Sequence, residues 1–114
     1  MRLLSLLILF VFAGCSRIDL DLSTATDARL LIYESGRIAT ECDLSDSQRA
    51  HIQDWLNRHN SGWSPSLDTW VPATYVTGTG FSINFMPFQV VVNYAPGQYT
   101  LEADSSEYPV LSCP

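Results

Sequence analysis

Two histidines are the residues of this sequence that would most readily bind a metal ion. His51 and His59 lie eight residues apart in a stretch with helical periodicity. On a helix this spacing places them on roughly the same side but two turns apart, whereas an i, i+4 pair could chelate one ion. Because no outside ligand is evident, the two histidines predict no metal site.

Catalytic patterns are equally weak. No serine lies in a Gly-x-Ser-x-Gly elbow. The run Thr-Gly-Thr-Gly at 77–80 lacks the Gly-Lys-Ser/Thr ending of a phosphate loop and leads into a predicted strand rather than a helix. Glu41 and Asp43 could form a carboxylate pair of the glycosidase type, but acidic side chains are mostly exposed, so a surface position is the simpler explanation. We therefore predict no enzyme, no catalytic residue and no cofactor.

Composition narrows the class of protein further. The chain has 114 residues and a formal net charge of -6, with 46% hydrophobic residues. The length predicts one domain, and the hydrophobic content excludes a disordered acidic tail. The acidic balance argues against nucleic acid, because its binders need clustered basic charge. A basic protein would suit this charge better as a partner.

The first fifteen residues have the pattern of a targeting segment. Arg2 is followed by an apolar stretch, residues 3–13, that is broken only by Ser5. This stretch is shorter than the roughly 20 residues of a spanning helix and is typical of the hydrophobic region of a signal peptide. It ends in Phe12-Ala13-Gly14-Cys15, which resembles the lipobox of bacterial lipoproteins, although Leu is usual at the position of Phe12.

The resemblance to bacterial lipoproteins has three implications. Residues 1–14 would be a signal peptide, Cys15 would carry the lipid that anchors the protein in a membrane, and residues 15–27 would form a lipidated tether before a single domain at 28–114. Asp after the lipidated cysteine favours the inner membrane in such proteins, so Ser16 implies the outer membrane, facing the periplasm. The inner membrane and the cell surface are alternative locations, and an ordinary cleaved signal or a buried N-terminal helix is the alternative to lipidation.

With Cys15 assigned to lipid, two cysteines remain. A secreted domain meets an oxidising environment, so Cys42 and Cys113 are expected to form a disulfide. The bond would tie the C-terminal tail to the body of the domain. A reactive thiol pair is the alternative, but the sequence has no Cys-x-x-Cys spacing.

Periodicity predicts a mixed fold that begins with strands. Residues 18–22 alternate apolar and acidic side chains, which indicates an edge strand. Residues 28–34 and 37–42 form a predicted hairpin around Ser35-Gly36, with Ile38, Thr40 and Cys42 on one face. A helix is predicted over 46–59, since Ser45 and Gln48 form a capping box. Its apolar stripe comprises Ile52, Trp55 and Leu56.

The rest of the chain reads as further strands and turns. Strands are predicted at 74–77, 81–85, 88–94 and 98–102, with a turn over 95–97 and a polar tail over 103–114. Phe88 and Tyr94 are expected to face inward with Val90 and Val92. Val91 on the opposite face indicates that the helix or the first hairpin partly covers that face. The predicted fold is α+β, an antiparallel sheet of about six strands with one helix packed on one face.

The connection over 60–73 holds the candidate partner-binding residues. Trp63 and Trp70 lie among serines and prolines, beside Asp68. Loop tryptophans are common anchors in protein recognition, but they also pin long connections to the domain. The core role is favoured for Trp63, and the two roles are evenly balanced for Trp70.

The size, the acidic charge and the predicted envelope location together suggest a protein-binding module. We expect a small acidic envelope lipoprotein that acts as an inhibitor or immunity protein against a basic cell-wall hydrolase. The alternative is an accessory lipoprotein in the structure or assembly of an envelope or secretion complex. A small-ligand or hydrolytic activity ranks last, because no catalytic constellation is present.

Overall fold

A computed structural model describes residues 16–95 and 97–114. The signal peptide and lipobox predicted for residues 1–15, and Pro96 in the turn predicted over 95–97, lie outside these residues. The described chain forms one antiparallel sheet of seven strands with helix α2 packed against it, so the predicted α+β class is confirmed. The strand count exceeds the expected six by one.

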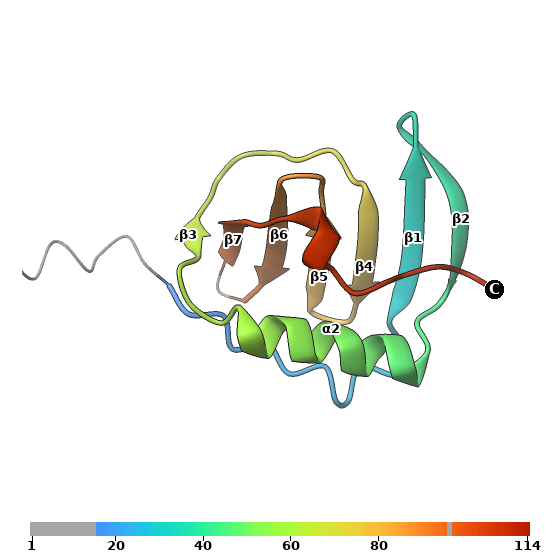
Figure 1. Ribbon diagram of the computed structural model, residues 1–114, viewed down its shortest axis with the longest axis horizontal. Helices are drawn as coiled ribbons and strands as arrows, with labels where there is room; N and C mark the ends of the chain where they lie inside the picture. The colour runs from blue at the N-terminus through green and yellow to red at the C-terminus, as the bar shows by residue number, and fades with distance from the viewer. Residues whose placement is uncertain (1–15, 96) are drawn as a thin grey trace, which may run out of the picture.

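The strands follow the order β2-β1-β4-β5-β6-β7-β3 across the sheet. Helix α2 crosses one end of the sheet nearly at right angles to the strands, and the C-terminal tail runs over the same face (Figure 1). The elements are β1 Arg29–Glu34, β2 Arg37–Asp43, α2 Asp46–Arg58, β3 Ser64–Pro65, β4 Thr74–Gly78, β5 Phe81–Phe85, β6 Gln89–Tyr94, β7 Gly97–Glu102 and the 3-10 turn η1 Ser105–Glu107.

The hairpin of β1 and β2 turns at Ser35-Gly36, as the sequence predicts. Both residues have positive φ, 52° and 78°. This conformation matches the tight hairpin turn whose twist suits the flanking strands, and glycine adopts it without a steric penalty.

A bulge in this hairpin makes one expectation wrong. Ile32 pairs with Thr40, but the next residue, Tyr33, pairs with Ile38, so Ala39 has no partner of its own. An extra residue reverses the side-chain alternation. Ile38 therefore leaves the face that Thr40 shares with Cys42, and 45% of its surface is exposed.

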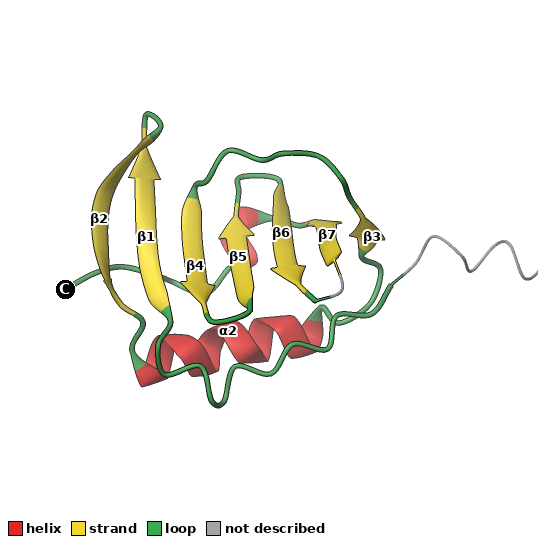
Figure 2. Ribbon diagram, turned by 180° about the vertical axis from the view of Figure 1, so that it is seen from behind, coloured by secondary structure: helices red, strands yellow, loops and turns green. Residues whose placement is uncertain are grey.

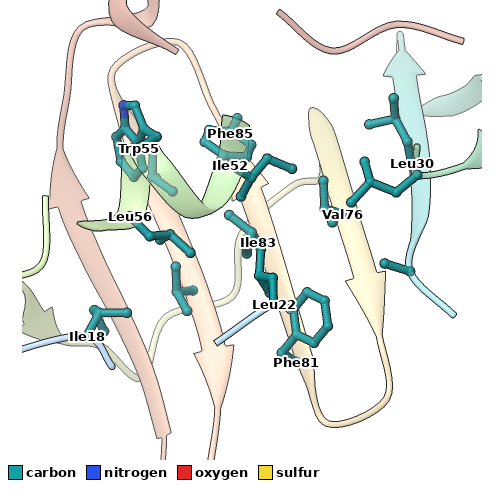
Figure 3. Close-up of a cluster of buried hydrophobic side chains, with 14 of the residues drawn as sticks. Ile18, Leu22, Leu30, Ile52, Trp55, Leu56, Val76, Phe81, Ile83 and Phe85 are labelled. Carbon is teal, nitrogen blue, oxygen red and sulfur yellow. The ribbon is translucent and has the colours of Figure 1, made fainter. Parts of the chain in front are cut away.

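Helix α2 begins as the sequence predicts. The Ser45 hydroxyl accepts from the Gln48 amide, and the Gln48 side chain accepts in return from the Ser45 amide. The helix ends at Arg58 with His59 as its C-cap. Its apolar stripe of Ile52, Trp55 and Leu56 is buried and packs on Val76, Ile83 and Phe85 of the sheet (Figure 3).

The N-terminal segment packs on the domain without forming the expected edge strand. Its one strand-like contact is a bridge between Ser16 and Trp63. The Ile18 amide donates to the Asn60 carbonyl, and the Leu22 amide donates to the Gln53 side chain. These amides are therefore bonded to α2 and its C-terminal end, while Ile18 and Leu22 enter the core.

Phe88 does not face inward as expected. Strand β6 begins one residue later, at Gln89, and Phe88 lies in the preceding turn with 85% of its surface exposed. Because Phe88 precedes the strand, the alternation that buries Val90 and Val92 completely does not include it.

The C-terminal tail is a structural part of the domain. The Tyr108 hydroxyl donates to the Met86 carbonyl at 2.7 Å, and the Gln48 side chain donates to the Ser112 carbonyl at 2.8 Å. Burial raises the pKa of the Tyr108 hydroxyl. Cys113 forms a disulfide with Cys42 of β2, with a Cα–Cα distance of 5.8 Å.

Replacing Cys42 and Cys113 together by serine should lower the free energy of unfolding by about 4 kcal/mol, because the disulfide closes a long loop in the unfolded chain. Urea titration followed by circular dichroism measures this loss. A reductant should destabilise the parent protein to the same degree and leave the double variant unchanged. Equal midpoints for the parent and the double variant would contradict the prediction.

Candidate partner-binding surface

Residues 66–73 run past the ends of the strands and are bonded to side chains of the second face of the sheet, opposite α2. This segment arches from β3 over the ends of β6 and β5 to β4 (Figure 2). The Asn84 side chain of β5 fixes its far end, since Oδ1 accepts from the Ala73 amide at 2.9 Å and Nδ2 donates to the Val71 carbonyl at 3.0 Å. Val91 is 2% exposed and is the strand neighbour of Asn84, so it lies on the face to which this connection is bonded and not on the face of α2.

Gln98 of β7 fixes the near end of the connection. Its carbonyl accepts from the Ser66 amide at 2.9 Å, and its side-chain nitrogen donates to the Asp68 carbonyl at 2.7 Å. Just before this point, Pro65 pairs with Tyr99 in the short strand β3. Sequence reasoning missed β3, because proline argues against a central strand but is tolerated at a sheet edge.

Between these two anchors the connection presents apolar side chains to solvent. Leu67 is fully exposed and Val71 is 67% exposed. Asp68 between them is also exposed. A segment that is tied at both ends and carries exposed apolar side chains loses little conformational entropy on binding, which favours recognition.

The two candidate tryptophans occupy different environments. Trp63 is fully buried, and its indole nitrogen donates to the His59 carbonyl, so it has no surface to offer a partner. Trp70 is half-buried. Its indole nitrogen is shielded from solvent without a hydrogen-bond partner among the described residues. Of the predicted partner-binding residues, Trp70 and Asp68 thus share the presented segment, and Trp63 belongs to the core.

Sequence reasoning missed Leu67 as a fully exposed apolar residue of this segment. It also missed a hollow of about 710 Å³ between the segment and the second face of the sheet. Asp68 is the one carboxylate among the described residues that line it. A single leucine in a serine-rich connection is part of no periodic pattern. Its exposed position becomes evident only from the structure, in which β3 pairs with β7 and holds the connection beside it.

The electrostatics of the domain are those of an acidic surface. All twelve Asp and Glu side chains are exposed. Among the described ion pairs, three arginines bind carboxylates: Arg29 contacts Asp43 and Glu41, Arg49 contacts Asp46, and Arg58 contacts Asp54.

Hydrogen bonds further favour ionised carboxyls. The Thr79 side chain donates to Asp27 and holds the pKa of that carboxyl below its ordinary value. The pKa of Asp21 and the pKa of Asp104 are lowered in the same way, by the backbone amides of Ser23 and Ser106. These groups therefore stay charged at neutral pH.

The residues considered for chemistry lie apart from the presented segment. Glu41 and Asp43 both pair with Arg29, an interaction that raises the pKa of the guanidinium. His51 is exposed, while His59 stacks on Trp55 with ring centroids 4.2 Å apart. Within 16–95 and 97–114, no group of three or more His, Cys, Asp and Glu side chains is arranged to bind a metal ion.

Comparison with protein-family models, with curated proteins and with solved structures found no match for this chain. Of the helices in the described part of the chain, none is long and apolar enough to cross a membrane.

Replacing Asn84 by leucine should free the presented segment. The change leaves the Ala73 amide and the Val71 carbonyl without their partner, so the free energy of unfolding should fall by about 1–3 kcal/mol. Hydrogen exchange at the Ala73 amide should accelerate. Asn93→Leu on the neighbouring strand is the matched control. Unchanged protection of Ala73 in Asn84→Leu would show that the side chain does not hold the segment.

Proposed function

We propose that this protein is a lipid-anchored protein of the bacterial envelope that binds a basic protein through the segment 66–71. The partner would be a basic cell-wall hydrolase, which the protein would inhibit or to which it would confer immunity. The observation that carries the proposal is a firmly anchored segment that presents Leu67 and Val71 on an acidic domain.

The charge of the domain would speed the approach of the partner, and its exposed apolar side chains would stabilise the contact. The twelve exposed carboxylates give the domain a field that attracts a basic protein and speeds its approach, an effect that salt screens. Leu67 and Val71 supply apolar area that becomes buried on contact. Asp68 lies between the two and would pair with a basic group of the partner.

The anchor rests on the resemblance of Phe12-Ala13-Gly14-Cys15 to a lipobox. A diacylglycerol on Cys15, with a further acyl chain on its amino group, would supply the several chains that stable membrane anchoring needs. The outer membrane, facing the periplasm, is the proposed location because Ser16 follows the cysteine. There the domain would meet hydrolases that reach the cell wall.

Replacing Cys15 by serine should abolish incorporation of a labelled fatty acid and release the protein from the membrane fraction, because the thiol that takes the lipid is lost. Radiolabelling and cell fractionation measure the two effects. Cys113→Ser, which removes a cysteine of the disulfide instead, should leave labelling intact. A Cys15→Ser protein that stays in the membrane fraction would refute the proposed anchor.

Binding to basic hydrolases can be measured by surface kinetics with a panel that includes a c-type lysozyme and a basic peptidoglycan amidase. At least one should bind and lose activity, with an association rate that falls as salt increases. Failure of every basic hydrolase to bind would refute the proposal. Co-purification with an envelope or secretion complex would then favour the accessory role.

Two charge reversals and one truncation distinguish long-range electrostatic attraction of the partner from direct contact with it. Asp68→Lys and Glu34→Lys change the net charge equally, so both should slow association. Only Asp68→Lys and Leu67→Ala should also speed dissociation, by roughly 30-fold for a residue at the centre of the contact. Equal dissociation rates for Glu34→Lys, Asp68→Lys and Leu67→Ala would contradict the role of segment 66–71.

A further inference from the structure

The hollow beside segment 66–71 has a floor that the proposed protein contact does not use. Strand register places four polar residues side by side across β4, β5, β6 and β7. Thr77 pairs with Ser82, Ser82 with Asn93, and Asn93 with Gln98. All four line the open, shallow hollow of about 710 Å³.

The polar groups of this row are left available. The Gln98 side chain holds segment 66–71 by donating to the Asp68 carbonyl, but the described hydrogen bonds use none of the side chains of Thr77, Ser82 and Asn93. Hydroxyls and amides can each donate and accept. Three adjacent strands thus bring unused donors and acceptors to one hollow, where Ser82 is 7% exposed.

The walls of the hollow are also defined. Segment 66–68 forms one wall, which Gln98 fixes to β7. Tyr75 adds an aromatic ring, held edge-on against the ring of Tyr33 with centroids 6.5 Å apart. Aromatic rings provide apolar area with little loss of side-chain freedom.

The charges of the lining residues indicate which class of ligand the hollow could bind. All twelve carboxylates of the protein are exposed, yet Asp68 is the only one that borders the hollow, and no basic residue is found among its described lining residues. A phosphate or carboxylate ligand would need a cation such as arginine.

We propose that this hollow, floored by Thr77, Ser82 and Asn93, binds a neutral oligosaccharide. Sugar hydroxyls would exchange hydrogen bonds with the row of hydroxyls and amides, and the Asp68 carboxylate would accept from further hydroxyls. The apolar face of a sugar ring would lie against Tyr75. The floor of the site lies on the sheet and takes no part in the proposed protein contact, whereas Leu67 and Asp68 border the hollow and also belong to that contact.

Calorimetric titration of the detergent-solubilised full chain with three trisaccharides tests this site. The probes are the neutral N-acetylglucosamine trimer, the neutral maltotriose and the anionic galacturonic acid trimer. At least one neutral probe should bind, and the anionic probe should bind more weakly. No binding of either neutral probe, or preference for the anionic one, overturns the proposal.

Matched variants locate the site. Thr77→Val and Asn93→Ala each remove hydrogen-bonding groups from the floor, so each should weaken the neutral probe by about three- to tenfold. Thr100→Val and Gln89→Ala make comparable changes on the same face but outside the hollow and should leave affinity unchanged. Circular dichroism checks that the variants are folded. Unchanged affinity in both floor variants overturns the assignment, whatever the outcome with basic hydrolases.

Discussion

The packing of the whole core depends on the indole of Trp55. This fully buried ring meets aromatic rings from four parts of the chain: His59 at the helix end, Trp63 in the following connection, Phe85 of β5 and Tyr108 of the tail, with centroids 4.2, 6.3, 5.6 and 5.9 Å away. The indole nitrogen has no hydrogen-bond partner among the described residues. Leaving a donor unpaired costs about 1–3 kcal/mol, so apolar and aromatic packing must outweigh this cost for the arrangement to persist.

This single cluster also explains why the two faces of the sheet can have separate roles. The helix, the N-terminal segment and the tail all converge on one face, where their apolar side chains meet Val76, Ile83 and Phe85. Within residues 16–95 and 97–114 the second face carries no helix, and the connection 66–73 is bonded to it through Asn84 and Gln98. Substitutions on the outer side of that connection therefore leave the core contacts intact.

Local signals in the sequence were sufficient for the elements near the start of the domain. The capping box of Ser45 and Gln48 and the turn at Ser35-Gly36 involve neighbours in the chain, and both are present. The bulge at Ala39 and the late start of β6 at Gln89 were not predictable. Both depend on which residues of another strand form the ladder, and alternation within one strand does not contain that information.

The candidate site was predictable only in part, for a related reason. Proline and tryptophan in 60–73 identified a connection that could bind a partner. Which of its residues are buried and which are exposed depends on residues far away in the sequence. Trp63 is buried because Ser16 and His59 lie against it, and segment 66–71 is presented because Gln98, some 30 residues later, bonds to Asp68.

The floor of the hollow shows the same limit more strongly. Thr77, Ser82, Asn93 and Gln98 are ordinary polar residues of four separate strands, and no spacing along the chain relates them. The antiparallel register makes them one row. A function that resides in such a row has no sequence motif, so the absence of a recognisable catalytic or binding motif in this chain does not argue against a ligand site on its sheet.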